Sequence, residues 1–268
     1  MKKTWNSVLA LLLAAGLAGC SSTAPASSAA ASSAEEPEET AEETAEETAE
    51  ETTEETTEET AEVMSYADYV AADMDAAVTV ETFVQGKQSW WQDAATLYCQ
   101  SEDGALFVYN GAISEEEYAK LVPGQAVRIK GFKGNFEGEI EIMDGEIEVI
   151  DGNWIAEPAD VTELLGTDEL INHQNELVSF KDMVIEPSQD EDGNDVAVTY
   201  KGEGDDIYFK ASSNGQTYDF TIECYLTGPD TDVYKAVGAL NIGDTVDLEG
   251  FLYWYQGPNP HITAVTVK

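Results

Sequence analysis

Basic residues are scarce in this sequence of 268 residues, which holds 12 lysines and arginines against 54 aspartates and glutamates. The formal net charge is -42. A protein that binds a polyanion needs clustered cations to release the counterions, so this balance predicts that nucleic acid is not a partner. The sequence has two histidines, neither of them in a nucleophile motif, and it lacks phosphate-binding glycine loops, HExxH and CxxC. We therefore expect a protein that is not an enzyme.

Long apolar runs are also absent, since the run near the start extends only from Val8 to Leu17. After two lysines, a run of this length predicts a secretory signal that is too short to span a bilayer. The motif Leu17-Ala18-Gly19-Cys20 resembles the lipobox of bacterial lipoproteins, which implies that residues 1–20 form a lipoprotein signal peptide and that Cys20 carries lipid. The alternative is an ordinary secreted protein with a chance cysteine after its cleavage site.

Basic residues are missing altogether between Glu35 and Glu62, a segment that contains 15 glutamates. Its Glu-Glu-Thr-Ala repeats place glutamate over glutamate at i,i+4, and no lysine relieves the repulsion. Together with the preceding run of serine and alanine, this composition predicts that residues 21–62 form a disordered tether. We interpret the tether as a solvated spacer between the membrane and the folded part.

Cysteines are too few for a disulfide scaffold, because only Cys99 and Cys224 remain besides Cys20. Cys99 alternates with Leu97, and Cys224 alternates with Phe220, so each falls on the apolar face of an expected strand. The sequence predicts two buried free thiols, one in each domain.

Alternation of apolar and polar residues with period two dominates after residue 77 and predicts a mostly β protein. One short helix interrupts the pattern in the first half, and Ser114 with Glu117 forms its capping box. The expected strands of this half are 78–85, 94–100, 106–109, 125–132 and 139–150. A helix between the third and fourth strands is typical of the OB-fold, a five-stranded partly open barrel.

The second half repeats this plan. Its expected strands are 177–185, 196–200, 207–211, 217–226, 244–255 and 261–267, with a helix over 232–240. The match is sharpest where Gly124 and Gly243 each end a helix and begin a Val-x-Ile/Leu-x-Gly strand. We predict two tandem OB-fold-like barrels, at residues 63–152 and 160–268. A single β-sandwich or two SH3-like barrels are the alternatives.

Several stretches of the first half also carry a family resemblance. They are residues 78–91, Asp103-Gly104, Val108-Tyr109-Asn110, the run 116–124 and Gly131-Phe132-Lys133. Together they resemble OB-fold domains of uncharacterised lipoproteins from Gram-positive, clostridia-like bacteria. The similarity covers residues 64–151, and it implies export and an OB-fold but no reaction.

A binding site is predicted where aromatic and basic residues gather in the first domain. OB-folds often bind oligonucleotides and oligosaccharides through the loop after the first strand, and that loop holds Trp90 and Trp91. Rings with a few donors suit a sugar, a peptide or an anionic wall polymer. The candidate ligand-binding residues are Lys87, Trp90, Trp91, Arg128, Lys130, Lys133 and Phe136. In the alternative interpretation, the two tryptophans cap the barrel and the bases pair with surplus acids.

Two weaker candidates lie in the second domain. Tyr253, Tyr255 and His261 form an aromatic cluster that serves either as a secondary binding edge or as a contact between the domains. Oxygen ligands alternate in an acidic loop, as Ca²⁺ prefers, at Asp190, Asp192 and Asn194. The loop departs from the EF-hand pattern, so an acidic hairpin turn without a cofactor is the alternative.

These observations predict a lipid-anchored protein at the outer face of the cytoplasmic membrane, outside the cell. We expect it to bind a wall glycan, a peptide or another small ligand through its barrel loops, without catalysis. A subunit of a cell-surface complex is the alternative, followed by a metal-dependent hydrolase.

Overall fold

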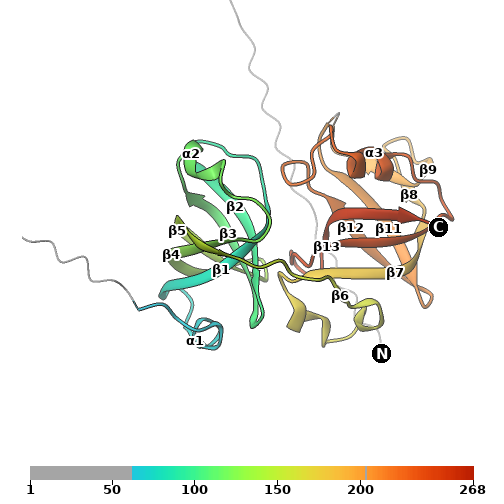
Figure 1. Cartoon of the computed structure of the whole chain (residues 1–268). Coiled ribbons are helices and arrows are strands. Elements are labelled where there is room, and N and C mark those ends of the chain that lie inside the picture. The colour runs from blue at the N-terminus through green and yellow to red at the C-terminus, as the bar shows by residue number, and fades with distance from the viewer. Residues whose placement is uncertain (1–61, 203) are drawn as a thin grey trace, which may run out of the picture. The chain divides into compact units, whose positions relative to one another are not determined.

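The computed structural model describes residues 62–268 with the exception of residue 203 (Figure 1). The predicted signal peptide, the lipid site at Cys20 and all but the last residue of the tether lie outside the described residues. The described part belongs to one compact unit, Thr57–Lys268. Among the helices of this part, none combines the length and the apolar character needed to cross a membrane.

Five strands of the first half close into a barrel. They are β1 (Ala77–Lys87), β2 (Ala94–Ser101), β3 (Gly104–Ala112), β4 (Gln125–Phe136) and β5 (Glu139–Asn153). β1 pairs antiparallel with β2 and β4, and β3 pairs parallel with β5, which gives the closed order β1-β2-β3-β5-β4. Closure leaves the barrel without a free sheet edge.

Two short helices complete the first barrel. α1 (Tyr66–Ala71) precedes β1, and its Tyr69 is buried in the barrel core. α2 (Glu115–Tyr118) lies between β3 and β4, where the capping box predicts a helix. The Ser114 hydroxyl accepts a hydrogen bond from the Glu117 N–H at 3.3 Å, which satisfies one of the free donors at the helix start.

The second half forms the same ring of pairings. Its strands are β7 (Leu177–Glu186), β11 (Ile207–Ser213), β12 (Gln216–Ile222), β13 (Thr245–Phe251) and β14 (His261–Val267). β7 pairs with β11 and β13, while β12 meets β14 in parallel. Helix α3 (Asp232–Gly238) lies between β12 and β13, as α2 lies between β3 and β4.

Smaller elements flank the second barrel. They are β6 (Ala159–Asp160), η1 (Thr162–Leu164), η2 (Leu170–His173), β8 (Ser188–Gln189), β9 (Asp195–Val196) and β10 (Val198–Tyr200). The strand expected at 196–200 therefore divides into β9 and β10. β10 pairs with β11 outside the ring of five, and β9 pairs with β8.

The internal repeat extends to backbone geometry. Gly124 has a φ of 92° and Gly243 a φ of 91°, so both glycines adopt the left-handed conformation that favours this residue. Each barrel also has its own buried core, built around Val127 and Ile129 in the first and Val246 and Leu248 in the second. The prediction of a mostly β chain with two tandem OB-fold-like barrels is confirmed, which removes the sandwich and SH3-like alternatives.

The cysteines follow the prediction only in part. Cys99 is buried in the first core, and both thiols of the described residues are free. Cys224 lies two residues beyond the end of β12 and is only half-buried. The prediction of a buried thiol in the second domain is wrong because the alternating strand stops at Ile222.

Candidate functional site

An aromatic layer joins the two barrels. Tyr98 and Phe107 lie on the outer face of β2 and β3, and they pack against Phe251 at the end of β13. The Tyr98 and Phe251 rings stack with their centroids 4.5 Å apart, and Phe107 meets Tyr253 at 5.2 Å. We call this layer, with the hydrogen bonds that cross it, the seam.

Polar contacts accompany the aromatic layer. The Tyr98 hydroxyl lies 2.6 Å from Nδ1 of His261, and the Gln100 side-chain oxygen accepts the Leu177 N–H at 2.8 Å. OB-folds bind oligonucleotides and oligosaccharides largely on the face of their second and third strands. In the first barrel, this face carries Tyr98 and Phe107, so the second barrel covers it.

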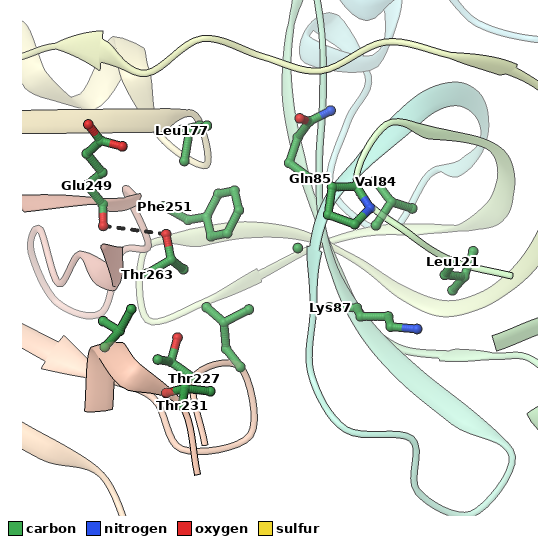
Figure 2. A pocket seen from close by; sticks show the side chains of 14 residues that line it. Val84, Gln85, Lys87, Leu121, Leu177, Thr227, Thr231, Glu249, Phe251 and Thr263 are labelled. Atoms are coloured by element: carbon green, nitrogen blue, oxygen red, sulfur yellow. Dashed lines mark hydrogen bonds between the residues drawn. The ribbon is translucent and has the colours of Figure 1, made fainter. Parts of the chain in front are cut away.

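A cleft of about 460 Å³ opens beside the seam (Figure 2). β1 and the residues after α2 form one wall, while β13, β14 and residues 226–233 form the other. Apolar side chains dominate the lining, which is Val84, Gln85, Gly86, Lys87, Leu121, Pro123, Leu177, Leu226, Thr227, Thr231, Val233, Glu249, Phe251 and Thr263. Its size is within the range of sites that hold small molecules.

Gly86 allows the two walls to approach each other. A Cβ atom at this position would lie 2.7 Å from Cε2 of Phe251 and 3.3 Å from Cδ1 of Leu226. The pairing of β1 with β2 also shifts register between Val84 and Gly86. A bulge and a glycine at one point thus bring β1 against the second barrel.

Lys87 is the one lysine or arginine that lines this cleft. Its Nζ donates to the Tyr118 carbonyl at 2.9 Å and lies 3.7 Å from the centroid of the Tyr118 ring. Burial lowers the pKa of Lys87 from its ordinary value. Glu249 on the opposite wall pairs with Lys181 at 3.7 Å, and among the described residues no carboxylate forms an ion pair with Lys87.

The two tryptophans of the predicted loop have different roles. Trp90 packs on the first core, and its Nε1 donates to the Ile113 carbonyl at 3.1 Å. Trp91 is 71% exposed. Only Trp91 is therefore largely exposed, and the two rings do not form a joint platform with Lys87.

The bases predicted to surround this platform are engaged elsewhere. Arg128 pairs with Glu81 at 2.7 Å and with Glu148 at 2.8 Å, as the alternative interpretation expects. Lys130 is exposed on β4. Lys133 is buried, and its Nζ donates to three carbonyls at the end of α1, so it cannot reach a ligand. Of the predicted first-domain site, the cleft retains only Lys87.

The aromatic cluster of the second domain contributes to the contact between the barrels. The rings of Tyr253 and His261 stack at 4.4 Å in the seam. Tyr255 and the predicted ligand residue Phe136 are both about half exposed, with their centroids 5.8 Å apart across the two halves. The contact between the barrels thus takes Tyr253 and His261 of the predicted cluster, while Tyr255 stays partly exposed.

The predicted calcium loop satisfies its own polar groups. Asp190 accepts hydrogen bonds from the backbone of Asp192 and Asn194 at 3.0 and 2.8 Å, and the Asn194 amide donates to it at 3.0 Å. These bonds lower the pKa of Asp190. Asp190 is therefore the side chain that closes this acidic turn.

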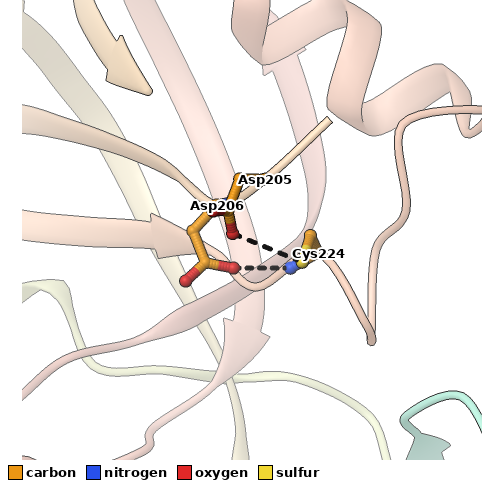
Figure 3. Close-up of side chains that lie close together, drawn as sticks. All are labelled: Asp205, Asp206 and Cys224. Atoms are coloured by element: carbon orange, nitrogen blue, oxygen red, sulfur yellow. Dashed lines mark hydrogen bonds between the residues drawn. The ribbon is translucent and has the colours of Figure 1, made fainter. Parts of the chain in front are cut away.

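A second acidic group lies near Cys224 (Figure 3). Ligand atoms of Asp205, Asp206 and Cys224 lie within 4.8 Å of one another. The Cys224 N–H donates to Asp206 at 2.9 Å, and its thiol lies 3.9 Å from Asp205. Burial, reinforced by Asp206, raises the pKa of the thiol to about 12, which disfavours the thiolate that a metal would require.

Comparison with known proteins adds structural neighbours only. No protein-family model and no curated protein match the chain. The p204 HINb domain aligns at 12% identity over 74% of this chain and 100% of its own, with a TM-score of 0.34. The Ifi202 HINa domain in complex with 20-bp dsDNA aligns at 13% identity over 72% of this chain and 98% of its own, with a TM-score of 0.32.

A third neighbour is the Replication Protein A heterotrimer bound to ssDNA. It aligns at 11% identity over 72% of this chain and 49% of the neighbour, with a TM-score of 0.31. At these TM-scores, the alignments locate no ligand site on this chain.

Two sequence predictions are wrong against these findings. The function predicted from the sequence, binding of a wall glycan, a peptide or another small ligand with its two alternatives, has no counterpart among these neighbours, two of which were solved with DNA. The exclusion of nucleic acid also fails, because two of these neighbours were solved with DNA. Both predictions fail for a physical reason as well. Net charge describes the whole chain whereas a ligand meets local groups, and most of the predicted loop site is engaged within the fold.

Proposed function

We propose that the cleft beside the seam binds a single-stranded nucleic acid, with one phosphate at Lys87 and an unpaired base against the apolar wall. The observation that carries this proposal is the position of Lys87. In a chain with a net charge of -42, this lysine forms no ion pair with the described carboxylates and lines an apolar cleft. A partly desolvated ammonium group of this kind attracts an anion.

The apolar lining supports the interpretation that the anion at Lys87 is the phosphate of a nucleotide. Leu226 and Val233 are half-buried in this lining and offer an apolar surface to the flat face of a base. A base within a duplex is paired and stacked, so it cannot enter a cleft. The proposal therefore favours a single strand over a duplex.

The acidic surface limits how much of a strand can bind. Residues 63–268 contain 39 acids and 10 bases, so a long polyanion is repelled outside the cleft. For a single phosphate contact, a plot of the logarithm of the binding constant against the logarithm of the salt concentration should have a slope of about −0.7. Binding is expected to be weak and confined to a short stretch of nucleotides.

Fluorescence anisotropy of a short labelled single-stranded oligonucleotide tests the proposal. We expect Lys87→Gln to weaken binding by about ten- to hundredfold, because a hydrogen bond to a charged group contributes roughly 1.5 to 3 kcal/mol. Lys130→Gln is the matched control, since it removes the same charge from an exposed position on β4. The same sequence as a duplex and a labelled fatty acid are the competing ligands.

Each outcome decides for or against the proposal. A strand that binds the wild type and the Lys130 variant alike, but the Lys87 variant weakly, supports it. Equal binding by the Lys87 variant, or no binding of the strand at low salt, overturns it. Saturable binding of the fatty acid alone would assign the cleft to a lipid-like carboxylate.

We also propose that the protein binds without catalysis, because both histidines are engaged. Nδ1 of His173 lies 2.7 Å from Glu176, and His261 is buried in the seam. Incubation of the oligonucleotide with the protein should therefore leave its length unchanged on a denaturing gel. Shortening that the Lys87 variant loses would contradict this.

For location, we propose attachment through Cys20 at the outer face of the cytoplasmic membrane, as the lipobox resemblance and the family resemblance imply. Cys20→Ser should then release the protein from the membrane fraction in a bacterial host. Retention of that variant in the membrane would contradict the proposal.

A further inference from the structure

Glu139 is buried at the junction of the two barrels without a positive partner. It is the first residue of β5 and is 0% exposed. One carboxylate oxygen, Oε2, accepts the Trp254 N–H at 2.8 Å and the Gln174 amide at 3.3 Å. Among the described residues, no lysine, arginine or histidine forms an ion pair with it. A single carboxyl group thus ties the first barrel to two segments of the second half.

The backbone around Glu139 strengthens this attachment. Carbonyl groups within residues 137–140 accept hydrogen bonds from Gln256 at 2.7 Å, Gln174 at 2.9 Å and Asn175 at 3.2 Å. Residues of the second half therefore hydrogen-bond to the backbone at the start of β5 and just before it. Any change in the charge of Glu139 acts at the centre of this strip.

Three buried oxygens beside this strip have no hydrogen-bond partner. They are Oε1 of Glu139, Oδ1 of Asn175 and the hydroxyl of Tyr69. An ionised carboxylate would place negative charge on the unpaired Oε1, which is costly in a buried site. A proton on that carboxyl removes the charge and turns an acceptor into a donor.

The surrounding groups favour the neutral acid. Glu141 lies on the same strand and is also buried, and the tyrosines that face Glu139 are Tyr69 from α1, Tyr98 from β2 and Tyr253 after β13. Lys133 lies 5.2 Å from the Tyr69 ring, but its ammonium is held by three carbonyls of α1 and its C-cap. Burial, with a smaller contribution from Glu141, raises the pKa of Glu139 to about 8, although the hydrogen bonds from the Trp254 N–H and the Gln174 amide lower it.

We propose that Glu139 is a proton-sensitive latch, which holds the two barrels together while it is neutral and weakens the seam when it ionises. The proposal concerns the contact between the barrels, and it stands whether or not the cleft binds nucleic acid.

The direction of the pH effect follows from linkage. In an opened seam the carboxyl meets water and returns to its ordinary pKa of 4.5, well below the value in the closed seam. The closed form therefore binds an extra proton between about pH 4.5 and about pH 8. Opening becomes about tenfold easier for each pH unit in this window, and it levels off above it. The latch is strongest in acid.

Glu139→Gln gives the matched variant, because glutamine is neutral at every pH and keeps an oxygen that can accept the Trp254 N–H. Glu137→Gln is the control, since Glu137 lies two residues away, is exposed and also contacts the second half through Gln256. Only the Glu139 variant should abolish the pH effect.

Hydrogen exchange at the Trp254 amide gives the first readout. The exchange rate of the wild type relative to Glu139→Gln, compared at equal pH, should rise on the order of a hundredfold between pH 6 and pH 8. The Glu137 variant should follow the wild type. A ratio that stays constant between these pH values would overturn the proposal.

Infrared difference spectroscopy of protein that retains Glu139 gives a second readout, which holds even if Glu139→Gln fails to fold. A protonated carboxyl shows a C=O stretch that a carboxylate lacks. Burial also raises the pKa of Glu223 to about 7, so the measurement uses Glu223→Gln as its background. In that background we expect the band at pH 6 and its loss with a midpoint of about 8. If no band of a protonated carboxyl is present at pH 6, Glu139 is ionised in the closed seam and the latch does not exist.

Discussion

The Tyr98 hydroxyl lies 2.6 Å from Nδ1 of His261, and this buried contact joins β2 of the first barrel to β14 of the second. The Gln88 amide donates to the same hydroxyl at 3.3 Å, so the Tyr98 O–H is free to donate to the imidazole. Burial lowers the pKa of His261 to about 4. The ring is therefore neutral at pH 7, and Nδ1 is its acceptor.

The first prediction concerns the pH dependence of this contact. The unfolded chain takes up a proton at His261 near pH 6.5, whereas the folded protein does so only near pH 4. The stabilising effect is therefore complete above about 6.5 and is lost as the pH falls toward 4. We expect the free energy of unfolding to decrease by roughly 3 kcal/mol over this interval.

Urea unfolding of the wild type and of His261→Gln, measured between pH 4 and pH 7, checks this expectation. The variant has no group that titrates at this position, so it serves as the reference for all other acids. The stability advantage of the wild type should shrink as the pH falls. An advantage that is the same at pH 4 and pH 7 would contradict a buried neutral imidazole.

The second prediction concerns the close approach at Gly86. Gly86→Ala places a methyl group 2.7 Å from Phe251, so the seam must shift to accept it. We expect a loss of roughly 1 to 3 kcal/mol in the free energy of unfolding, as is typical of an overpacked interface. Thermal or urea unfolding measures this loss.

Gly202→Ala is a suitable control for Gly86, because its new Cβ would meet only Asp205 atoms at 3.7 Å. The cost at Gly86 should also become smaller in a Phe251→Leu background, where the ring is absent. If Gly86→Ala costs the same in both backgrounds, contact with Phe251 is not the cause.

The positions of the strands along the chain can be predicted from the sequence in both barrels, because the residues of each core strand alternate between an apolar and a polar face. In β2 and β3, the core residues Leu97, Cys99, Leu106 and Val108 fall on one phase of the alternation. Turn glycines then indicate where strands end, and the Ser114 cap indicates where the helix begins. Such signals lie within a few residues of the elements that they define.

The contact between the barrels depends on longer-range information. Tyr98 and Phe107 stand on the opposite phase from the core residues, where an isolated barrel would meet water. Aromatic residues on the outer face of a strand indicate a second packed surface. The sequence does not indicate which segment covers that surface. Glu139 and Glu141 alternate with Ile140 and Ile142 as solvent-facing residues would, yet both are buried, and Trp254 and Gln174 of the second half hydrogen-bond to Glu139.

The third prediction concerns Lys133, which was expected to bind a ligand and instead stabilises α1. Its Nζ donates to the carbonyls of Tyr69 at 3.0 Å, Val70 at 2.8 Å and Ala72 at 2.8 Å. Lys133→Met keeps much of the side-chain volume but removes all three donors. We expect a loss of about 3 kcal/mol in the free energy of unfolding, because buried acceptors are left unpaired.

Urea unfolding, together with limited proteolysis near α1, measures the effect at Lys133. Lys130→Met removes a lysine from an exposed site on the same strand, and it should change stability by less than about 0.5 kcal/mol. If both variants unfold at the same urea concentration and resist the protease equally, the three hydrogen bonds do not stabilise α1.

The fourth prediction concerns the reactivity of the two thiols, measured with a disulfide reagent on protein that carries Cys20→Ser. Burial raises the pKa of Cys99 well above its ordinary value, and burial with Asp206 raises that of Cys224 to about 12. At pH 8 both groups are therefore thiols, and the thiolate is the reactive form. Cys224 is half-buried, so it should react slowly in the folded protein, whereas Cys99 should react only after unfolding.

Asp206→Asn tests the electrostatic part of this prediction. The variant removes a negative charge beside Cys224 and keeps an oxygen that can accept the Cys224 N–H, which donates to Asp206 at 2.9 Å. The pKa of the thiol should then fall, and the reaction at Cys224 should become faster at pH 8. Asp190→Asn removes the same charge from the loop between β8 and β9, which does not contribute to the pKa of Cys224, and should leave the rate unchanged. Equal rates for the two variants would show that burial alone governs the thiol, and rapid modification of Cys99 in the folded protein would contradict its place in the first core.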